Sequence, residues 1–145
     1  MKRSDNTAKE RCFLDTNILL YTDDGAAPAK QTQALHLLED GWNSGTLVLS
    51  TQVLQEYTVA ASRKLGVPIA TVQRKVELFH ALEILSIEHR DIVRAIELHR
   101  LYQFSFWDSL IIRMAQKASC AVLLSEDLQH GQTIGDLRIV NPFRV

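Results

Sequence analysis

The sequence predicts an α/β domain in which helices cover both faces of a parallel sheet of four to five strands. Apolar runs such as 12–14 and 121–124 lack the strict alternation of half-exposed strands, so each is expected to be buried on both faces. Segments with apolar residues at helical spacing separate these runs. Strands that alternate with helices in this way form parallel sheets.

The elements are expected in the following order. A strand at 12–14 is followed by an apolar turn at 18–21 that leads into a polar loop. Helical spacing predicts a helix over 29–42, a buried strand at 46–50 and a helix over 51–65. The remaining helices are expected at 69–81, at 87–102 and from 105 onward, and the remaining strands at 82–85, 121–124 and 137–140, with a loop between Gly131 and Gly135.

The gross properties indicate one domain over 11–145, preceded by a polar extension at 1–10. The chain has 145 residues, 46% of them hydrophobic, which suffices for one core. Its 16 basic and 17 acidic residues exclude binding of nucleic acid through overall positive charge. The polar start resembles no secretory signal, and Cys12 and Cys120 lie in apolar runs typical of reduced thiols, so we expect a cytoplasmic protein without membrane association.

Four acidic residues lie where such a sheet binds ligands. Asp15 and Asp127 follow apolar strands, and the carboxyl ends of parallel strands share one edge. Glu56 and Asp108 lie in the first turns of predicted helices, which begin at the same edge. We therefore expect the four carboxylates to converge.

Converging carboxylates repel one another, and a hard divalent cation compensates for this repulsion. Mg²⁺ and Mn²⁺ prefer oxygen ligands and can be shared with a substrate phosphate. A metal held by Asp15 and Asp108 can activate water and offset charge in the transition state, which predicts phosphodiester hydrolysis. The five histidines lack HxxxH or HxH spacing and no CxxC motif occurs, which disfavours zinc.

Each acid taken alone also has a structural interpretation. Ser105 and Asp108 have the spacing of a helix capping box, and an Asp that follows a strand, such as Asp15, commonly caps a turn or helix. At the fourth position Asp127 is favoured over Glu126, although either could cap the next turn. The convergence of all four acids, rather than any single one, carries the prediction of a site.

Aromatic and basic residues are secondary candidates. Phe104, Phe106 and Trp107 lie next to an apolar helix start and are interpreted as packing anchors rather than as a surface for base stacking. Neighbouring basic residues could contact phosphates, but solvated helix faces explain them equally well. These are Arg63 and Lys64, Arg74 and Lys75, and Arg113 and Lys117.

Four motifs follow one another in the order Phe13-Leu14-Asp15-Thr16-Asn17, Gln55-Glu56, Phe106-Trp107-Asp108 and Leu124-Ser125-Glu126-Asp127-Leu128-Gln129-His130-Gly131. This set resembles the PIN-domain family, and within it the VapC-type toxins, over nearly the whole chain. The resemblance implies a three-layer α/β/α fold and endoribonuclease activity that depends on Mg²⁺ or Mn²⁺. It also implies a homodimer and an antitoxin whose C-terminal segment occupies the active-site groove.

Carried over by position, the resemblance assigns the metal-binding aspartates to Asp15 and Asp108, the acid of the second helix to Glu56, and the more variable fourth acid to Asp127. All four are thus candidate catalytic and metal-binding residues. Asn17 and Ser125 match polar positions that support the site. The polar extension before the first strand departs from the family pattern, because members commonly begin that strand within a few residues of their start.

Other function classes stay open. Asp15 could be the nucleophile of a phosphatase, although the second acid expected two residues later is Asn17. A module that binds RNA or protein without cleavage would not need four mutually repelling acids. An RNA-processing nuclease without a toxin role is a further alternative. Neither a GxxxxGK[ST] nor a GxGxxG stretch occurs, which excludes nucleotide binding through such loops.

Overall fold

A single six-stranded sheet forms the centre of the computed structural model, which describes residues 10–144. The predicted extension at 1–10 lies outside the described residues except for Glu10. The strands are arranged in the order β3-β2-β1-β4-β6-β5, and all pairs are parallel except β5 with β6. Their bounds are β1 Cys12–Leu14, β2 Leu47–Ser50, β3 Glu83–Leu85, β4 Val122–Leu124, β5 Thr133–Ile134 and β6 Leu137–Val140.

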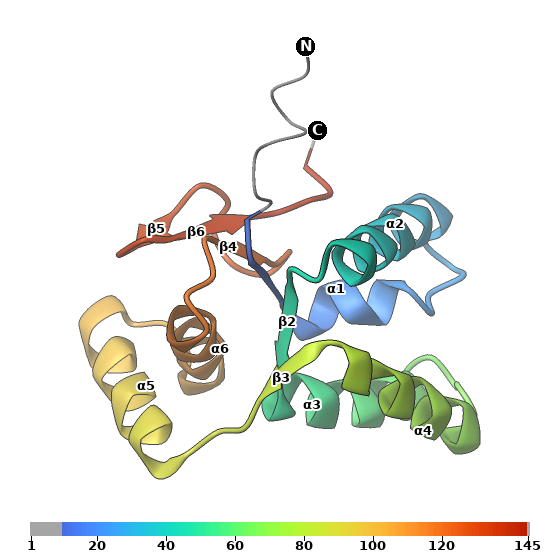
Figure 1. The fold of residues 1–145 in the computed structure, drawn as a ribbon, viewed down its shortest axis with the longest axis horizontal. Helices are drawn as coiled ribbons and strands as arrows, with labels where there is room; N and C mark the ends of the chain where they lie inside the picture. Colours follow the sequence, from blue (N-terminus) through green and yellow to red (C-terminus); the bar gives the residue numbers. More distant parts are fainter. Residues whose placement is uncertain (1–9, 145) are drawn as a thin grey trace.

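Helices cover both faces of this sheet, as predicted. Helices α5 and α6 lie on one side, and α1 to α4 lie on the other (Figure 1), which gives three layers. Their bounds are α1 Thr16–Tyr21, α2 Pro28–Ser44, α3 Thr51–Arg63, α4 Ile69–Leu78, α5 His89–Tyr102 and α6 Phe106–Lys117, with a 3₁₀ turn, η2, at Phe79–Ala81.

Two elements differ from the sequence-based expectation. The segment 18–21, expected as a turn, belongs to α1, which begins because an Asp15 carboxylate oxygen accepts the Thr16 backbone N–H at 2.7 Å. A six-residue helix is too short for its apolar period to be recognised. The expected loop between Gly131 and Gly135 contains β5, so the sheet has six strands rather than four to five. This two-residue strand depends on pairing with β6 rather than on a pattern of its own.

Three helix boundaries differ by a few residues from the sequence-based expectation, and side-chain caps explain the first two. The helix expected from 105 begins at Phe106, and Ser105 Oγ accepts the Asp108 N–H at 3.1 Å. The helix expected from 87 begins at His89, because Glu88 and Asp91 form a capping box. The helix expected to reach 81 ends at Leu78 and continues as the 3₁₀ turn η2. The first of these caps fixes the position of Asp108 in α6.

A buried ion cluster joins α6 to α5. Asp91 is fully buried, and its carboxylate accepts hydrogen bonds from Arg113 Nε at 3.0 Å and Lys117 Nζ at 2.8 Å. Burial alone would raise the pKa of Asp91, but Lys117, the Glu88 backbone N–H and Arg113 together hold it below its ordinary value. The cluster therefore holds the helix that carries Asp108 against its neighbour.

Asp91→Ala is expected to lower the free energy of unfolding by about 3–5 kcal/mol at neutral pH, because it leaves two cations without their buried partner. Since the pKa of Asp91 is depressed by folding, this contribution is present at neutral pH and is lost as the pH falls through the depressed value. Urea unfolding at several pH values measures both effects. Glu97→Ala, which removes an exposed pair with Arg94, is the control. Equal losses in the two variants would contradict the role of the cluster.

Candidate functional site

The carboxyl ends of β1 and β4 bring Asp15 and Ser125 together. Leu14 pairs with Leu124, and the Asp15 backbone N–H donates to the Leu124 carbonyl at 3.0 Å. Immediately beyond these strands, Ser125 Oγ donates to Asp15 Oδ2 at 2.7 Å. The strand pairing thus places these two side chains at the predicted edge of the sheet.

Glu56 reaches the same edge from α3. This helix begins directly after β2, so its first two turns lie at the carboxyl ends of the strands. Thr16 Oγ1 donates to Glu56 Oε1 at 2.7 Å, and Gln52 Nε2 donates to Glu56 Oε2 at 3.2 Å. Both carboxylate oxygens of Glu56 are therefore held by neighbouring side chains.

The loop after β4 separates two adjacent acids. Asn17 Nδ2 donates to Asp127 Oδ2 at 3.0 Å, and Asn17 Oδ1 accepts the Glu126 backbone N–H at 3.1 Å. The Glu126 carboxylate instead accepts the Tyr21 hydroxyl at 2.6 Å and pairs with Lys30. Asn17 thus ties the loop to α1, with Asp127 beside the other acids and Glu126 bound elsewhere.

The acids at this edge influence one another electrostatically. Burial raises the pKa of Asp15 to about 6, although hydrogen bonds from Ser125 and the Thr16 backbone oppose the shift. The charges of Asp108 and Asp127 raise the pKa of Asp15 further. An ionised Asp15 is therefore costly in the folded protein unless a cation is nearby.

Asp108 shows the same pattern. Burial raises the pKa of Asp108, the hydrogen bond with Ser105 lowers it, and the charges of Asp127 and Glu56 raise it again. Each of the four predicted acids thus acts on at least one of the others. Folding brings them into one electrostatic neighbourhood.

The donor chemistry fits a hard divalent ion. Among residues 10–144, no group of three or more Asp, Glu, His or Cys side chains is arranged to hold a metal by itself. Mg²⁺ commonly takes only one or two protein carboxylates and completes its shell with water and phosphate oxygens. Asp15 and Asp108 are suited to this, because a cation would offset the raised pKa of each. Metal binding by all four acids stays a prediction.

A groove of about 630 Å³ adjoins this edge on the side of α3 and α6. Its lining includes Glu56, Val59, Arg63 and Lys64 from one face of α3, together with Trp107. Trp107 is 61% exposed, so its expected role as a packing anchor is wrong. Phe104, in contrast, packs against the core.

A smaller hollow of about 260 Å³ lies beside Asp127, between α1 and the end of α3. It is lined by Asn17 and Asp127 near the site, and Lys64 lines both hollows. Lys64 is thus a cation that the two hollows share.

Two residues of the site were missed by sequence reasoning. Thr16 lies between the expected strand and the turn expected at 18–21, and no helix was expected there, so its contact with Glu56 was not foreseen. Gln52 lies one helical turn before Glu56 and is only 3% exposed. The spacing was a usable signal, because a polar residue four positions before a candidate acid shares its helix face.

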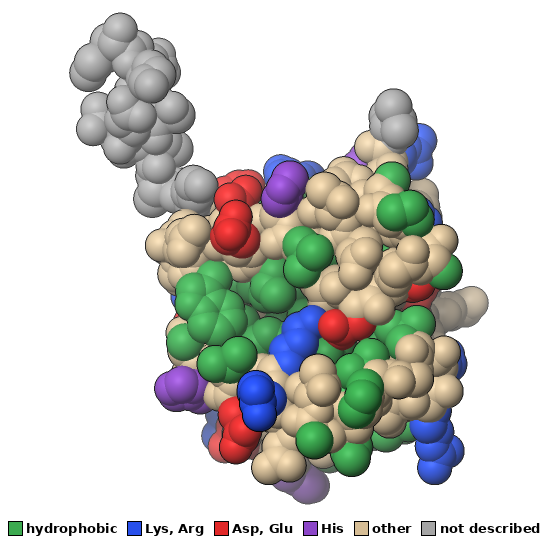
Figure 2. Space-filling model, turned by 90° about the vertical axis from the view of Figure 1, so that its right-hand side faces the viewer, with side chains coloured by type: hydrophobic (Ala, Val, Ile, Leu, Met, Phe, Trp, Pro, Cys, Tyr) green, Lys and Arg blue, Asp and Glu red, His purple; other side chains and the backbone are tan. Residues whose placement is uncertain are grey.

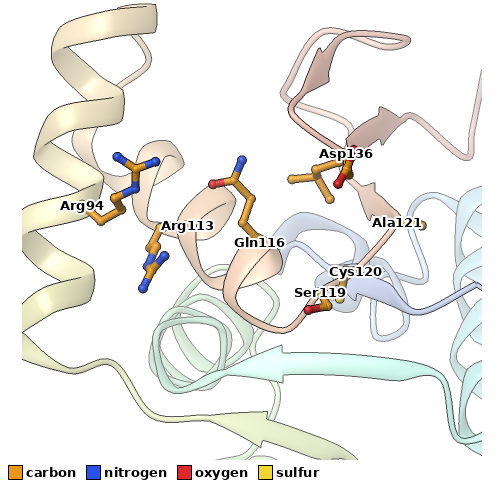
Figure 3. Close-up of a pocket in the computed structure, with 8 residues that line it drawn as sticks. Arg94, Arg113, Gln116, Ser119, Cys120, Ala121 and Asp136 are labelled. Atoms are coloured by element: carbon orange, nitrogen blue, oxygen red, sulfur yellow. The ribbon is translucent and has the colours of Figure 1, made fainter.

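A separate hollow of about 490 Å³ lies at the opposite, amino ends of β4 and β6 (Figure 3). Arg94, Arg113 and Gln116 line it from α5 and α6, together with Cys120 and Asp136. Arg113 is already paired with Asp91, and burial raises the pKa of the Cys120 thiol to about 12. The Cys120 thiol in this hollow is therefore protonated at neutral pH.

The surface has no single basic field on the face shown in Figure 2, where Lys, Arg, Asp and Glu side chains are interspersed with hydrophobic ones. This agrees with the balanced composition, whose formal net charge is −1. Within the described part of the chain, the helices are too short or too polar to cross a membrane. Affinity for an anionic ligand must come from local groups.

Known structures share this fold. A toxin-antitoxin complex from Klebsiella pneumoniae has a TM-score of 0.68 at 22% identity and covers 92% of this chain and 99% of its own. VapBC2 from Rickettsia felis bound to a promoter DNA fragment has a TM-score of 0.63 at 22% identity, over 88% and 96% of the two chains. Mycobacterium tuberculosis VapC20, described as a Sarcin-Ricin loop cleaving toxin, has a TM-score of 0.62 at 20% identity, over 80% and 91%.

A comparison with curated proteins gives no match. The family model described as the PIN domain matches residues 12–133. That region contains β1 and β4, whose carboxyl ends carry Asp15 and Ser125, as well as Glu56, Asp108 and Asp127. Because the match spans most of the sequence, the chain belongs to the PIN-domain family.

Proposed function

We propose that this chain is a divalent-metal-dependent endoribonuclease and the toxin of a toxin-antitoxin pair. The observation that carries the proposal is the group of four acids at one sheet edge, with Asp15 buried and its pKa raised to about 6. Such an arrangement is unfavourable for stability, and a site that binds a cation and a phosphodiester accounts for it. Mg²⁺ or Mn²⁺ is the proposed cofactor.

The residues have distinct proposed roles. Asp15 and Asp108 would hold the metal, which would supply charge stabilisation at the phosphate and a lowered pKa for water. Asp15 keeps its orientation through Ser125, and Asp127 keeps its own through Asn17. Glu56, whose two oxygens are both held, orients the water that attacks phosphorus.

The similar structures support the proposed partners. VapC20 is described as a toxin that cleaves the Sarcin-Ricin loop, and the Klebsiella and Rickettsia structures as a toxin-antitoxin complex and VapBC2. By analogy, we propose RNA as the substrate, an antitoxin protein as a partner and a homodimer as the assembly. A phosphatase with Asp15 as nucleophile is disfavoured, because Asp15 is only 6% exposed and both of its oxygens accept hydrogen bonds.

Incubation of the purified protein with total RNA tests this function. Cleavage is expected with Mg²⁺ or Mn²⁺ and is expected to fall at least a hundredfold with a chelator, because the metal stabilises transition-state charge by several kcal/mol. Return of excess metal should restore it. Asp40→Asn, which removes an exposed acid on α2, should cleave like the wild type. Cleavage that survives chelation would exclude metal dependence, and intact RNA with folded, metal-supplied protein would exclude the nuclease.

A further inference from the structure

The indole of Trp107 lies exposed beside the acids, where a packing residue would be covered. It is 61% exposed and lines the same groove as Glu56. Trp107 also directly precedes Asp108 in α6. We infer that Trp107 stacks on a nucleobase of the substrate strand next to the cleaved phosphate, an inference that rests on the ribonuclease function proposed above.

One side chain links Trp107 to the acid site. Gln52 Nε2 donates to Glu56 Oε2 and to the Trp107 carbonyl, both at 3.2 Å. Gln52 is only 3% exposed, so packing restricts the motion of its side chain. Phe106 packs edge to face on the indole, with ring centroids 5.1 Å apart. The backbone of Trp107 is thus tied to the Glu56 carboxylate through Gln52, and the indole has Phe106 packed against it.

Two cations remain available at the far end of the groove. Arg63 and Lys64 line it, both are exposed, and neither makes an ion pair within residues 10–144. The other basic candidates are largely occupied, since Lys75 pairs with Asp23 at 3.0 Å. Arg113 and Lys117 both pair with Asp91. The groove therefore keeps its positive charge for an external anion.

Together these groups match a short single strand of RNA. A nucleotide segment needs a site for the reacting phosphate, a flat apolar surface for a base and a cation for the next phosphate. The groove is lined by all three: Glu56 of the acid group, Trp107 of α6, and Arg63 with Lys64 at the C-terminal end of α3. A base can reach an indole only when it is unstacked from its neighbours, so the inference requires the contacted nucleotide to be unpaired.

Kinetics test the stacking role. Trp107→Ala is expected to raise KM for a single-stranded oligoribonucleotide roughly 5- to 150-fold, the range expected for loss of one base stack, with a smaller change in kcat. Trp107→Phe, which keeps an aromatic face, should recover much of this loss. Trp42→Phe on α2 alters the only other tryptophan and should leave KM and kcat unchanged.

Fluorescence tests the contact without turnover. In the Trp42→Phe protein, Trp107 is the sole tryptophan. With chelator present, a normal oligoribonucleotide should quench its emission. An oligonucleotide of the same length that lacks its bases should quench far less, although it carries the same phosphate charge. Equal quenching by both would overturn the inference.

The outcomes separate this inference from the proposed function. If the wild type cleaves RNA and Trp107→Ala has unchanged KM and kcat, the stacking role is wrong and the nuclease stands. If that variant keeps its RNA kinetics but loses affinity for the co-expressed protein partner, the indole serves a protein and the inference is also overturned. If the wild type cleaves no RNA, the proposed function fails. The fluorescence comparison between the oligonucleotides with and without bases then still decides whether Trp107 contacts a base.

Discussion

Asp15→Asn and Asp108→Asn are each expected to reduce RNA cleavage by about a thousandfold or more. Under the proposed function, both changes remove a negative charge that would bind the metal, and loss of several kcal/mol of charge stabilisation corresponds to that factor. Neither change alters the size of the side chain. Initial rates with a defined RNA and excess Mn²⁺ measure the effect.

Asp15→Asn should remain folded, because the raised pKa of Asp15 shows that the folded protein disfavours a charge at this position. The folded protein raises the pKa of Asp15 from 3.8 to about 6, so the buried carboxylate reduces stability by about 3 kcal/mol once it is ionised. Stability in metal-free buffer therefore falls as the pH rises from 3.8 to 6. Asn is neutral throughout, and Asp15→Asn is expected to weaken this pH dependence.

The assignment of the acids has one contradicting result, and unfolding of a variant must be checked separately. Wild-type rates in either variant would remove that residue from the catalytic group. A variant that is inactive only because it has unfolded, as judged by urea unfolding, would leave the rate uninformative, so Asp108→Asn provides the second comparison. Asp40→Asn remains the control for a change of charge alone.

Expression of the wild-type chain alone is expected to stop the growth of its bacterial host, and co-expression with a small partner protein encoded beside it should restore growth. One nuclease molecule can cleave many RNA molecules, so even low expression should be harmful. A partner that fills the groove would exclude RNA from the acids. Colony counts after induction, with and without the partner, measure both effects.

The inactive Asp108→Asn chain is the matched control for the growth experiment and should be tolerated at the same expression level. Toxicity of that variant would assign the harm to something other than RNA cleavage. Harmless expression of an active wild-type enzyme would favour an RNA-processing nuclease over a toxin. The growth experiment thus decides between the two nuclease proposals.

The placement of the acids at one edge could be predicted because it follows from chain connectivity. A residue directly after a parallel strand must lie at the carboxyl edge, which placed Asp15 and Ser125 correctly. A helix that begins directly after β2 also starts there, which placed Glu56. Only α1 and β5 were missed, because elements of six and two residues carry too short a pattern.

The choice of which of two similar neighbouring residues lies in the site, in contrast, required the tertiary structure. Sequence alone left Glu126 beside Asp127 as an alternative, and the fold favours Asp127, because the Glu126 carboxylate is already bound by Lys30 and Tyr21. It also leaves Trp107 exposed where apolar spacing favoured packing.

The sequence by itself determined the fold class and the edge of the sheet at which the acids gather, because local patterns and chain connectivity control both. The tertiary structure alone decided which side chains face that edge. It also decided which charged side chains are paired with a partner, such as Glu126, and which can still contact a ligand, such as Arg63 and Lys64. These properties depend on contacts between residues as far apart as Asn17 and Asp127, whose separation of 110 positions leaves no trace in local sequence.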